Sequence, residues 1–222
     1  MEAWILMMRI AEKEGNKKAL KRAYENIHSL DPTDNTVIYN LGIIEYEAGN
    51  LTKALSYFKK YITSYPKDIE ARSFLFDIYR KQKEDDLAFE EAKAIIKLRP
   101  QESSYYHYIF EYLNNIGNYK DMVSVMEDGL KTHPKDGDLR RYLILAYLQT
   151  GKDDLASEQM KEILKSNPDD ITILLQLARL QEKQKRYKEA LETYKRIIDV
   201  SPGHEEAEDA YLRLRLEVLP HE

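Results

Sequence analysis

Histidines and carboxylates are the side chains in this sequence that could bind a metal or transfer a proton. The five histidines are spread over the chain, as His28, His107, His133, His204 and His221. No two of them have the spacing of an HExxH metal motif, and the 222 residues include no cysteine. The sequence also contains no Gly-rich phosphate loop and no GxSxG nucleophile motif. These observations predict a protein that is not an enzyme and holds neither a metal nor a cofactor.

Carboxylates occur in pairs at residues 85–86, 153–154 and 169–170, next to predicted turns and helix starts. A carboxylate at a helix N-terminus accepts hydrogen bonds from unpaired amides and complements the helix dipole. We therefore interpret these acids as helix caps and solvated charges. His107 lies beside tyrosines, and we expect it to make a hydrogen-bonding contact rather than to act in catalysis.

A spacing of 34 residues organises the sequence. It separates six of the seven prolines, namely Pro32, Pro66, Pro100, Pro134, Pro168 and Pro202. Proline ends a helix because it lacks the amide proton and clashes with the preceding turn. The period therefore divides the chain into six repeats, at residues 1–34, 35–68, 69–102, 103–136, 137–170 and 171–204, followed by a last segment at 205–222.

The fifteenth residue of each repeat marks a turn. Glycine occupies it four times, as Gly15, Gly49, Gly117 and Gly151, and lysine twice, as Lys83 and Lys185. Glycine after a helix adopts a left-handed conformation at little cost. Each repeat is therefore expected to hold a helix A at about its residues 2–14 and a helix B at about its residues 18–30. The two lysines predict turns with strain or with a different closure.

Apolar residues recur in the same phase of every repeat. The seventh position holds Met7, Leu41, Leu75, Ile109, Leu143 and Leu177, and the tenth position begins with Ile10 and Ile44. Spacings of three and four residues place such positions on one stripe of a helix. One helix hairpin cannot bury this stripe alone, so neighbouring repeats are expected to stack and share a continuous core.

The period, the Leu41-Gly42 pair, the turn glycines, the alanine of helix B (Ala54 in the second repeat) and the closing proline resemble the tetratricopeptide repeat family over residues 1–204. The resemblance implies an all-α, right-handed solenoid of six helix–turn–helix repeats with a C-terminal capping helix. It also implies a non-catalytic scaffold that binds a peptide or a helical segment of a partner protein. Arg72 and Arg140 depart from the family pattern, which has an apolar residue at the fourth position.

In that family the A helices line the concave face, so the resemblance also indicates which positions would bind a partner. The candidate groove residues are Tyr39, Asn40, Ile43, Tyr46, Phe74, Asp77, Arg80, His107, Tyr108, Glu111, Arg141, Tyr142 and Leu145. Neighbouring aromatic residues of the fourth repeat, Tyr105, Tyr106, Phe110 and Tyr112, are expected in the core instead.

The sixth position carries an aromatic ring in three consecutive repeats, as Phe74, Tyr108 and Tyr142. Large rings bury much area while losing little side-chain entropy, so binding hot spots favour them. We expect these rings to anchor the partner, while Asp77 and Arg80 help to fix its register. The alternative is that the rings only fill gaps between neighbouring A helices.

Charge argues against nucleic acid as the partner. Acidic residues outnumber basic ones by 39 to 34, and the largest excess of basic residues in any repeat is three. Phosphate binding needs a basic stripe, which this distribution does not supply. A base-reading helical repeat is therefore a less favoured alternative. An enzymatic role remains only if this chain is the docking region of a larger polypeptide, which is also less favoured.

The first helix suggests an alternative function. Residues 3–8 form a continuous apolar run, Ala-Trp-Ile-Leu-Met-Met, and no single helix face can bury all of it. Either preceding residues are missing, or the helix packs against another molecule. In the second case the protein is a self-assembling homo-oligomer, with Trp4, Ile5 and Met8 as the candidate contacts.

The sequence has no run of about 18 apolar residues, so it predicts no direct membrane insertion. No secretory signal is visible either, which makes the cytoplasm the default location unless the sequence is trimmed. The identity of the protein or peptide partner does not follow from these patterns.

Overall fold

The computed structural model describes residues 1–218, and this part of the chain forms thirteen α-helices and no strand. The helices are α1 (Glu2–Glu14), α2 (Lys17–Leu30), α3 (Asn35–Glu47), α4 (Leu51–Ser64), α5 (Ile69–Gln82), α6 (Asp85–Leu98), α7 (Ser103–Asn115), α8 (Tyr119–Thr132), α9 (Gly137–Gln149), α10 (Asp153–Ser166), α11 (Ile171–Lys183), α12 (Tyr187–Val200) and α13 (Glu205–Val218). None of these helices is long and apolar enough to cross a membrane. The prediction of an all-α helical repeat solenoid is confirmed.

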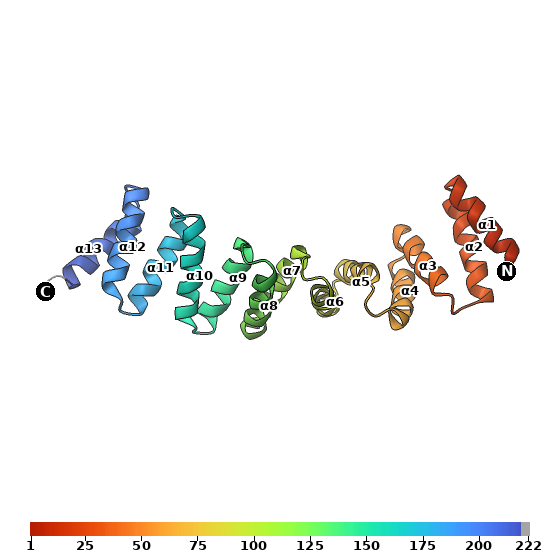
Figure 1. Cartoon of the computed structure of the whole chain (residues 1–222), viewed down its shortest axis with the longest axis horizontal. Coiled ribbons are helices and arrows are strands. Elements are labelled where there is room, and N and C mark those ends of the chain that lie inside the picture. Colours follow the sequence, from red (N-terminus) through yellow and green to blue (C-terminus); the bar gives the residue numbers. More distant parts are fainter. Residues whose placement is uncertain (219–222) are drawn as a thin grey trace. The chain divides into compact units, whose positions relative to one another are not determined.

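The chain divides into two compact units, unit 1 from Met1 to Tyr112 and unit 2 from Leu113 onward. Within unit 1, each helix from α1 to α6 packs on its neighbour in the chain, and within unit 2 the helices from α8 to α13 do the same (Figure 1). A single array over residues 1–204 and its right-handed twist stay predictions. The capping segment expected at 205–222 begins as α13, and residues 219–222 lie outside the described residues.

Aspartates fix where most of the A helices begin. The side chain of Asp34 accepts hydrogen bonds from two backbone amides of α3, at 2.9 and 3.2 Å. Asp68, Asp136 and Asp170 cap α5, α9 and α11 in the same way. At α13 the ring Nδ1 of His204 accepts the amide hydrogen of residue 207 at 3.3 Å instead. Because each aspartate directly precedes its helix, α3, α5, α9 and α11 begin one residue earlier than predicted.

All six turns at the fifteenth position are left-handed. The glycines have φ values of 64° to 76°, and Lys83 and Lys185 have φ values of 61° and 60°. A side chain in this conformation crowds the backbone and costs about 1–2 kcal/mol per residue. The strain predicted at the two lysines is therefore present, and their turns close as the glycine turns do.

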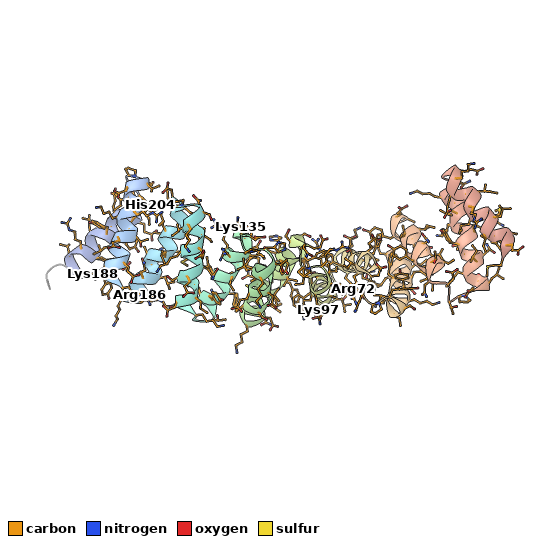
Figure 2. All side chains as sticks on the ribbon, viewed as in Figure 1. Arg72, Lys97, Lys135, Arg186, Lys188 and His204 are labelled. Atoms are coloured by element: carbon orange, nitrogen blue, oxygen red, sulfur yellow. The ribbon has the colours of Figure 1, made fainter. Side chains whose placement is uncertain are left out.

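Cations bind the carbonyl groups of prolines that end the B helices. Arg72, labelled in Figure 2, donates from Nε to the Pro66 carbonyl at 2.8 Å and from Nη1 to the Glu91 carboxylate at 2.6 Å. Arg140 makes the equivalent pair of hydrogen bonds in unit 2. Lys60 of α4, which is a B helix, donates from Nζ to the carbonyl oxygen of Pro32 at 2.6 Å. The two arginines that depart from the family pattern therefore join successive repeats.

The seventh-position residues lie at the centre of the core, with one exception. Five of them, Leu41, Leu75, Ile109, Leu143 and Leu177, are buried. In contrast, Met7 is 42 % exposed, and Ile10 at the tenth position is 47 % exposed. The expectation that these two residues are buried is wrong, because α1 packs on α2 through its opposite face.

Candidate functional site

A cleft of ≈ 490 Å³ lies between α3 and α5 in unit 1. Five of the candidate groove residues line it, namely Tyr39, Ile43, Tyr46, Phe74 and Asp77. They come from the fifth, sixth, ninth and twelfth positions of two successive A helices, whose spacing places them on one helix face. The structure thus brings these five side chains together on the surface of one unit.

Tyr46, Asp77 and Lys81 form a hydrogen-bonded group at one end of this cleft. The Tyr46 hydroxyl donates to the Asp77 carboxylate, and Lys81 Nζ lies 2.6 Å from Asp77 Oδ2 and 2.7 Å from the Tyr46 hydroxyl oxygen. Burial alone raises the pKa of Asp77, but the hydrogen bonds from Lys81 and Tyr46 outweigh it and hold this pKa below its usual value. Asp77 therefore carries a negative charge in the cleft at neutral pH.

Further tyrosine hydroxyls make hydrogen bonds around the same cleft. Tyr39 donates to the Glu70 carboxylate at 3.1 Å, and burial together with this bond raises the pKa of Tyr39. The Tyr105 hydroxyl lies 2.9 Å from Ser73 Oγ. Tyr105 is half-buried and lines the cleft, so its assignment to the core is wrong. A tyrosine hydroxyl needs a polar partner, and this feature of the sequence could have indicated that Tyr105 lies at the cleft rather than in the core.

Phe74 both lines the cleft and fills space between helices. Its ring stacks on the buried Phe58 of α4, with centroids 4.7 Å apart and an angle of 7° between the planes. It also meets the ring of Tyr46 edge to face at 5.1 Å. The gap-filling interpretation of the sixth position therefore applies to part of the surface of Phe74.

A second cleft, of ≈ 560 Å³, lies on the other side of α3, against α2. Asn40 and Ile43 line it, together with lysines that sequence reasoning missed. Lys21 Nζ lies 2.7 Å from a carboxylate oxygen of Glu45, which is almost fully buried, and Lys17 Nζ lies 2.6 Å from a carboxylate oxygen of residue 47. The two clefts share Ile43, so one bound chain segment could contact both.

Candidate residues of α5 and α7 make other contacts within unit 1. The Arg80 guanidinium lies 5.4 Å from the ring centroid of Tyr108 and 5.6 Å from that of Phe76. His107 Nε2 lies 4.0 Å from a carboxylate oxygen of Glu111, and both side chains are exposed. These residues present charged and aromatic groups at the surface, outside the two clefts.

Unit 2 holds the last three candidates. Arg141 and Leu145 line a cleft of ≈ 160 Å³ between α9 and α11, and Tyr142 is half-buried outside it. Arg141 Nη2 lies 2.7 Å from Asp170 Oδ2. Burial raises the pKa of Asp170, but the hydrogen bond from Arg141 and that from a backbone amide of α11 outweigh it, so this pKa lies below its usual value. A groove that continues from unit 1 to unit 2 stays a prediction.

The apolar run in α1 divides between two faces. The three predicted self-association residues, Trp4, Ile5 and Met8, are half-buried. They pack against the core cluster that contains Tyr24 and Leu41, so they lie on the inner face of α1. The exposed part of the run consists of Leu6 and Met7, followed by Ile10. The exposed apolar surface of α1 therefore lies on residues other than the three that the sequence predicted.

Acidic residues that the sequence marked as possible metal ligands or proton donors make structural contacts. In the described part of the chain, no set of three or more His, Cys, Asp or Glu could hold a metal ion. Asp86 accepts a hydrogen bond from the Tyr112 hydroxyl at 2.7 Å, and Asp154 accepts one from Arg186, labelled in Figure 2, at 2.8 Å. His221 lies outside the described residues.

Helix hairpins that recur with a 34-residue period define this chain as a helical repeat protein. A family model described as tetratricopeptide repeat matches residues 156–214, and a second model with the same description matches residues 36–68. The TPR repeat-containing protein MJ1428 of Methanocaldococcus jannaschii is 25 % identical over 165 residues, which cover 70 % of this chain and 29 % of that protein. Residues 36–68 and 156–214 of this chain therefore carry tetratricopeptide repeats.

Solved structures share the fold. The crystal structure of YrrB, a TPR protein with an unusual peptide-binding site, matches with a TM-score of 0.56 at 15 % identity, over 85 % of this chain and 97 % of that chain. The structure of Naa15/Naa10 bound to HypK-THB matches with a TM-score of 0.53 at 17 % identity, over 98 % of this chain and 39 % of that chain. Family and fold together make this protein a repeat scaffold of the protein–protein interaction type.

Proposed function

We propose that unit 1 binds an extended or helical segment of a partner protein in the clefts on either side of α3. The observation that carries this proposal is the cleft of ≈ 490 Å³, where Tyr39, Ile43 and Tyr46 offer apolar and aromatic surface beside the charged Asp77. Binding sites commonly combine such surface with a few well-placed polar groups. The proposal includes no catalytic step, no cofactor and no nucleic acid, and it places the protein in the cytoplasm.

The dimensions of the site fit a short chain segment. Packed helices lie about 8–10 Å apart, and an extended chain advances about 3.3 Å per residue. About three residues of a partner therefore pass each A helix, and about six reach from the cleft beside α2 to the cleft beside α5. Ile43, which lines both clefts, would contact the middle of such a segment.

The candidate residues of unit 1 have two roles in this proposal. Tyr39, Ile43, Tyr46 and the exposed part of Phe74 supply affinity through buried area, and Tyr108 extends this surface if the segment is longer. The charged and polar side chains fix the register through hydrogen bonds and ion pairs, namely Asn40, Asp77, Arg80, His107 and Glu111. Arg141, Tyr142 and Leu145 belong to unit 2 and are not part of this proposed site.

A binding measurement with matched variants tests the proposal. A partner segment identified by cross-linking is synthesised as a fluorescent peptide, and its affinity is measured by anisotropy. Tyr46→Ala is expected to weaken binding by about 30-fold, which corresponds to about 2 kcal/mol. Leu148→Ala, at the equivalent twelfth position in unit 2, is expected to change affinity by less than about threefold. Unchanged affinity in Tyr46→Ala, with the helical circular dichroism intact, would refute the proposal.

A further inference from the structure

The outer face of α1 carries an apolar stripe. Leu6, Met7 and Ile10 are exposed by 60 %, 42 % and 47 %, and Ala3 is exposed beside them. Residues at spacings of three, four and seven share one side of a helix, so these four side chains form a continuous strip. The inner face of the same helix packs on unit 1 through Trp4, and the strip lies on the other side.

The second repeat shows what kind of element packs on the equivalent positions of α3. The equivalent positions of α3 are Val37, Leu41 and Ile44, which correspond to Ala3, Met7 and Ile10. In unit 1 these residues of α3 pack against Tyr24 and Ile27 of α2, with Leu20 beside them. The element expected to pack on the strip is therefore an amphipathic helix. Its apolar residues would be spaced by four and then three positions, as in Leu20, Tyr24 and Ile27.

Helix α1 has this spacing itself, because Ala3, Met7 and Ile10 are also four and then three residues apart. We propose that α1 of a second copy of this chain covers the strip, so that the two α1 helices pack antiparallel about a two-fold axis near residues 6 and 7. In this arrangement the small Ala3 of each copy lies opposite the larger Ile10 of the other. Leu6 and Met7 meet at the centre.

The charges beside the strip are compatible with this pairing. Glu2 and Arg9 are seven residues apart on one flank of the strip, and both are exposed. An antiparallel two-fold arrangement brings Glu2 of each copy towards Arg9 of the other. The midpoint of Glu2 and Arg9 differs from that of Ala3 and Ile10 by one residue, or about 1.5 Å along the helix. The apolar and the charged contacts can therefore form in the same register.

Pairing would give one particle two copies of the proposed binding clefts. A partner with two recognition segments would then gain avidity without any new contact. The pairing itself does not depend on the clefts, because it uses the face of α1 alone. Its failure would leave the proposed function of unit 1 untouched.

Sedimentation equilibrium of the full chain, from about 1 to about 100 μM, tests this proposal. We expect a concentration-dependent dimer, and we expect the double variant Met7→Glu/Ile10→Glu to remain a monomer over the whole range. Leu87→Glu is the control, because Leu87 is 43 % exposed on α6, away from the strip. Circular dichroism and Trp4 fluorescence establish that each variant is folded.

A covalent trap provides the second measurement. The chain has no cysteine, so Leu6→Cys introduces a single thiol at the centre of the expected contact. Mild oxidation should convert this variant to a disulfide-linked dimer much faster than it converts Leu87→Cys. A chain that stays monomeric at about 100 μM, or a dimer that survives Met7→Glu/Ile10→Glu, would overturn the proposal.

Discussion

The cleft between α3 and α5 in unit 1 and the cleft between α9 and α11 in unit 2 share the fifth, ninth and twelfth positions of one A helix and the sixth position of the next. They differ in size, ≈ 490 Å³ against ≈ 160 Å³. The fifth position is Tyr39 in unit 1 and Arg141 in unit 2, and the twelfth is Tyr46 and Leu148. Tyr39 makes a hydrogen bond to a carboxylate of α5, whereas Arg141 forms an ion pair with the residue that caps α11.

The helix caps and turns are alike in the two units. Both clefts lie between two A helices whose starts are capped by aspartates, Asp68 in unit 1 and Asp170 in unit 2, and both units contain left-handed turns at the fifteenth position. Both clefts therefore lie between successive A helices, and they differ in the side chains that line them.

Phe74→Ala should have the largest effect on stability. It removes a ring that stacks on the buried Phe58, and we expect the free energy of unfolding of unit 1 to fall by about 3 kcal/mol. Gln176→Ala, at the exposed sixth position of unit 2, should change stability by less than about 0.5 kcal/mol. Urea unfolding followed by the fluorescence of Trp4, the only tryptophan, reports on unit 1, and circular dichroism reports on the whole chain. Equal losses in the two variants would contradict the comparison.

Arg141→Met should have an intermediate and pH-dependent effect. The side chain of Asp170 is only 10 % exposed, and losing its charged donor should destabilise unit 2 by about 1–2 kcal/mol near pH 7. The pKa of Asp170 is lower in the folded than in the unfolded chain, because the hydrogen bonds from Arg141 and a backbone amide outweigh the effect of burial. Its stabilising contribution is therefore present above the unfolded pKa of about 4 and is lost as the pH falls through the folded pKa.

The measurement for Arg141→Met is urea unfolding of the variant and the parent protein across the acid range. The difference between them should be largest near neutral pH and should shrink in acid, where Asp170 is protonated in both proteins. Tyr39→Phe is the matched change in unit 1, and its exposed hydrogen bond should contribute no more than about 0.5 kcal/mol. A stability difference for Arg141→Met that grows on acidification would show that the ion pair is not its source.

Lys83→Gly and Lys185→Gly should have the smallest effects, and these should be equal in the two units. Each replaces a left-handed lysine by the residue that adopts this conformation at least cost, and we expect a gain of about 1 kcal/mol in thermal or urea unfolding. Gly151→Ala is the opposite change and should cost a similar amount, because a Cβ there meets no atom within 4 Å and only the backbone conformation matters. Gains confined to one unit would show that the turns are not equivalent.

Much of the fold could be predicted because the signals are local. Proline spacing, aspartate caps and turn residues act within a few positions of the chain, and a 34-residue period repeats them. The predicted helix starts were one residue late, because Asp34 and its equivalents are the N-cap residues and each helix begins at the next residue. The role of Arg72 was not predictable from the family pattern, since its partners are a proline carbonyl of the preceding repeat and a carboxylate of helix B.

The candidate site was harder to predict than the fold, because it depends on contacts between repeats. The sixth position indicated a surface ring at Phe74, but its stacking on Phe58 requires the relative placement of α4 and α5. The same limit applied to α1, where an apolar run without gaps does not indicate which side faces the core. The packing of Trp4 on α2 and α3 settles this orientation and leaves Met7 outside.

Photo-cross-linking from matched positions tests whether the partner segment binds at the clefts of unit 1. Position nine is Ile43 in unit 1 and Leu145 in unit 2, and each lines the cleft of its own unit. With p-benzoyl-phenylalanine at one or the other position, we expect cross-links to a single partner segment from position 43 in large excess over position 145. Equal yields from the two positions, or a segment captured only from position 145, would contradict binding at the clefts of unit 1.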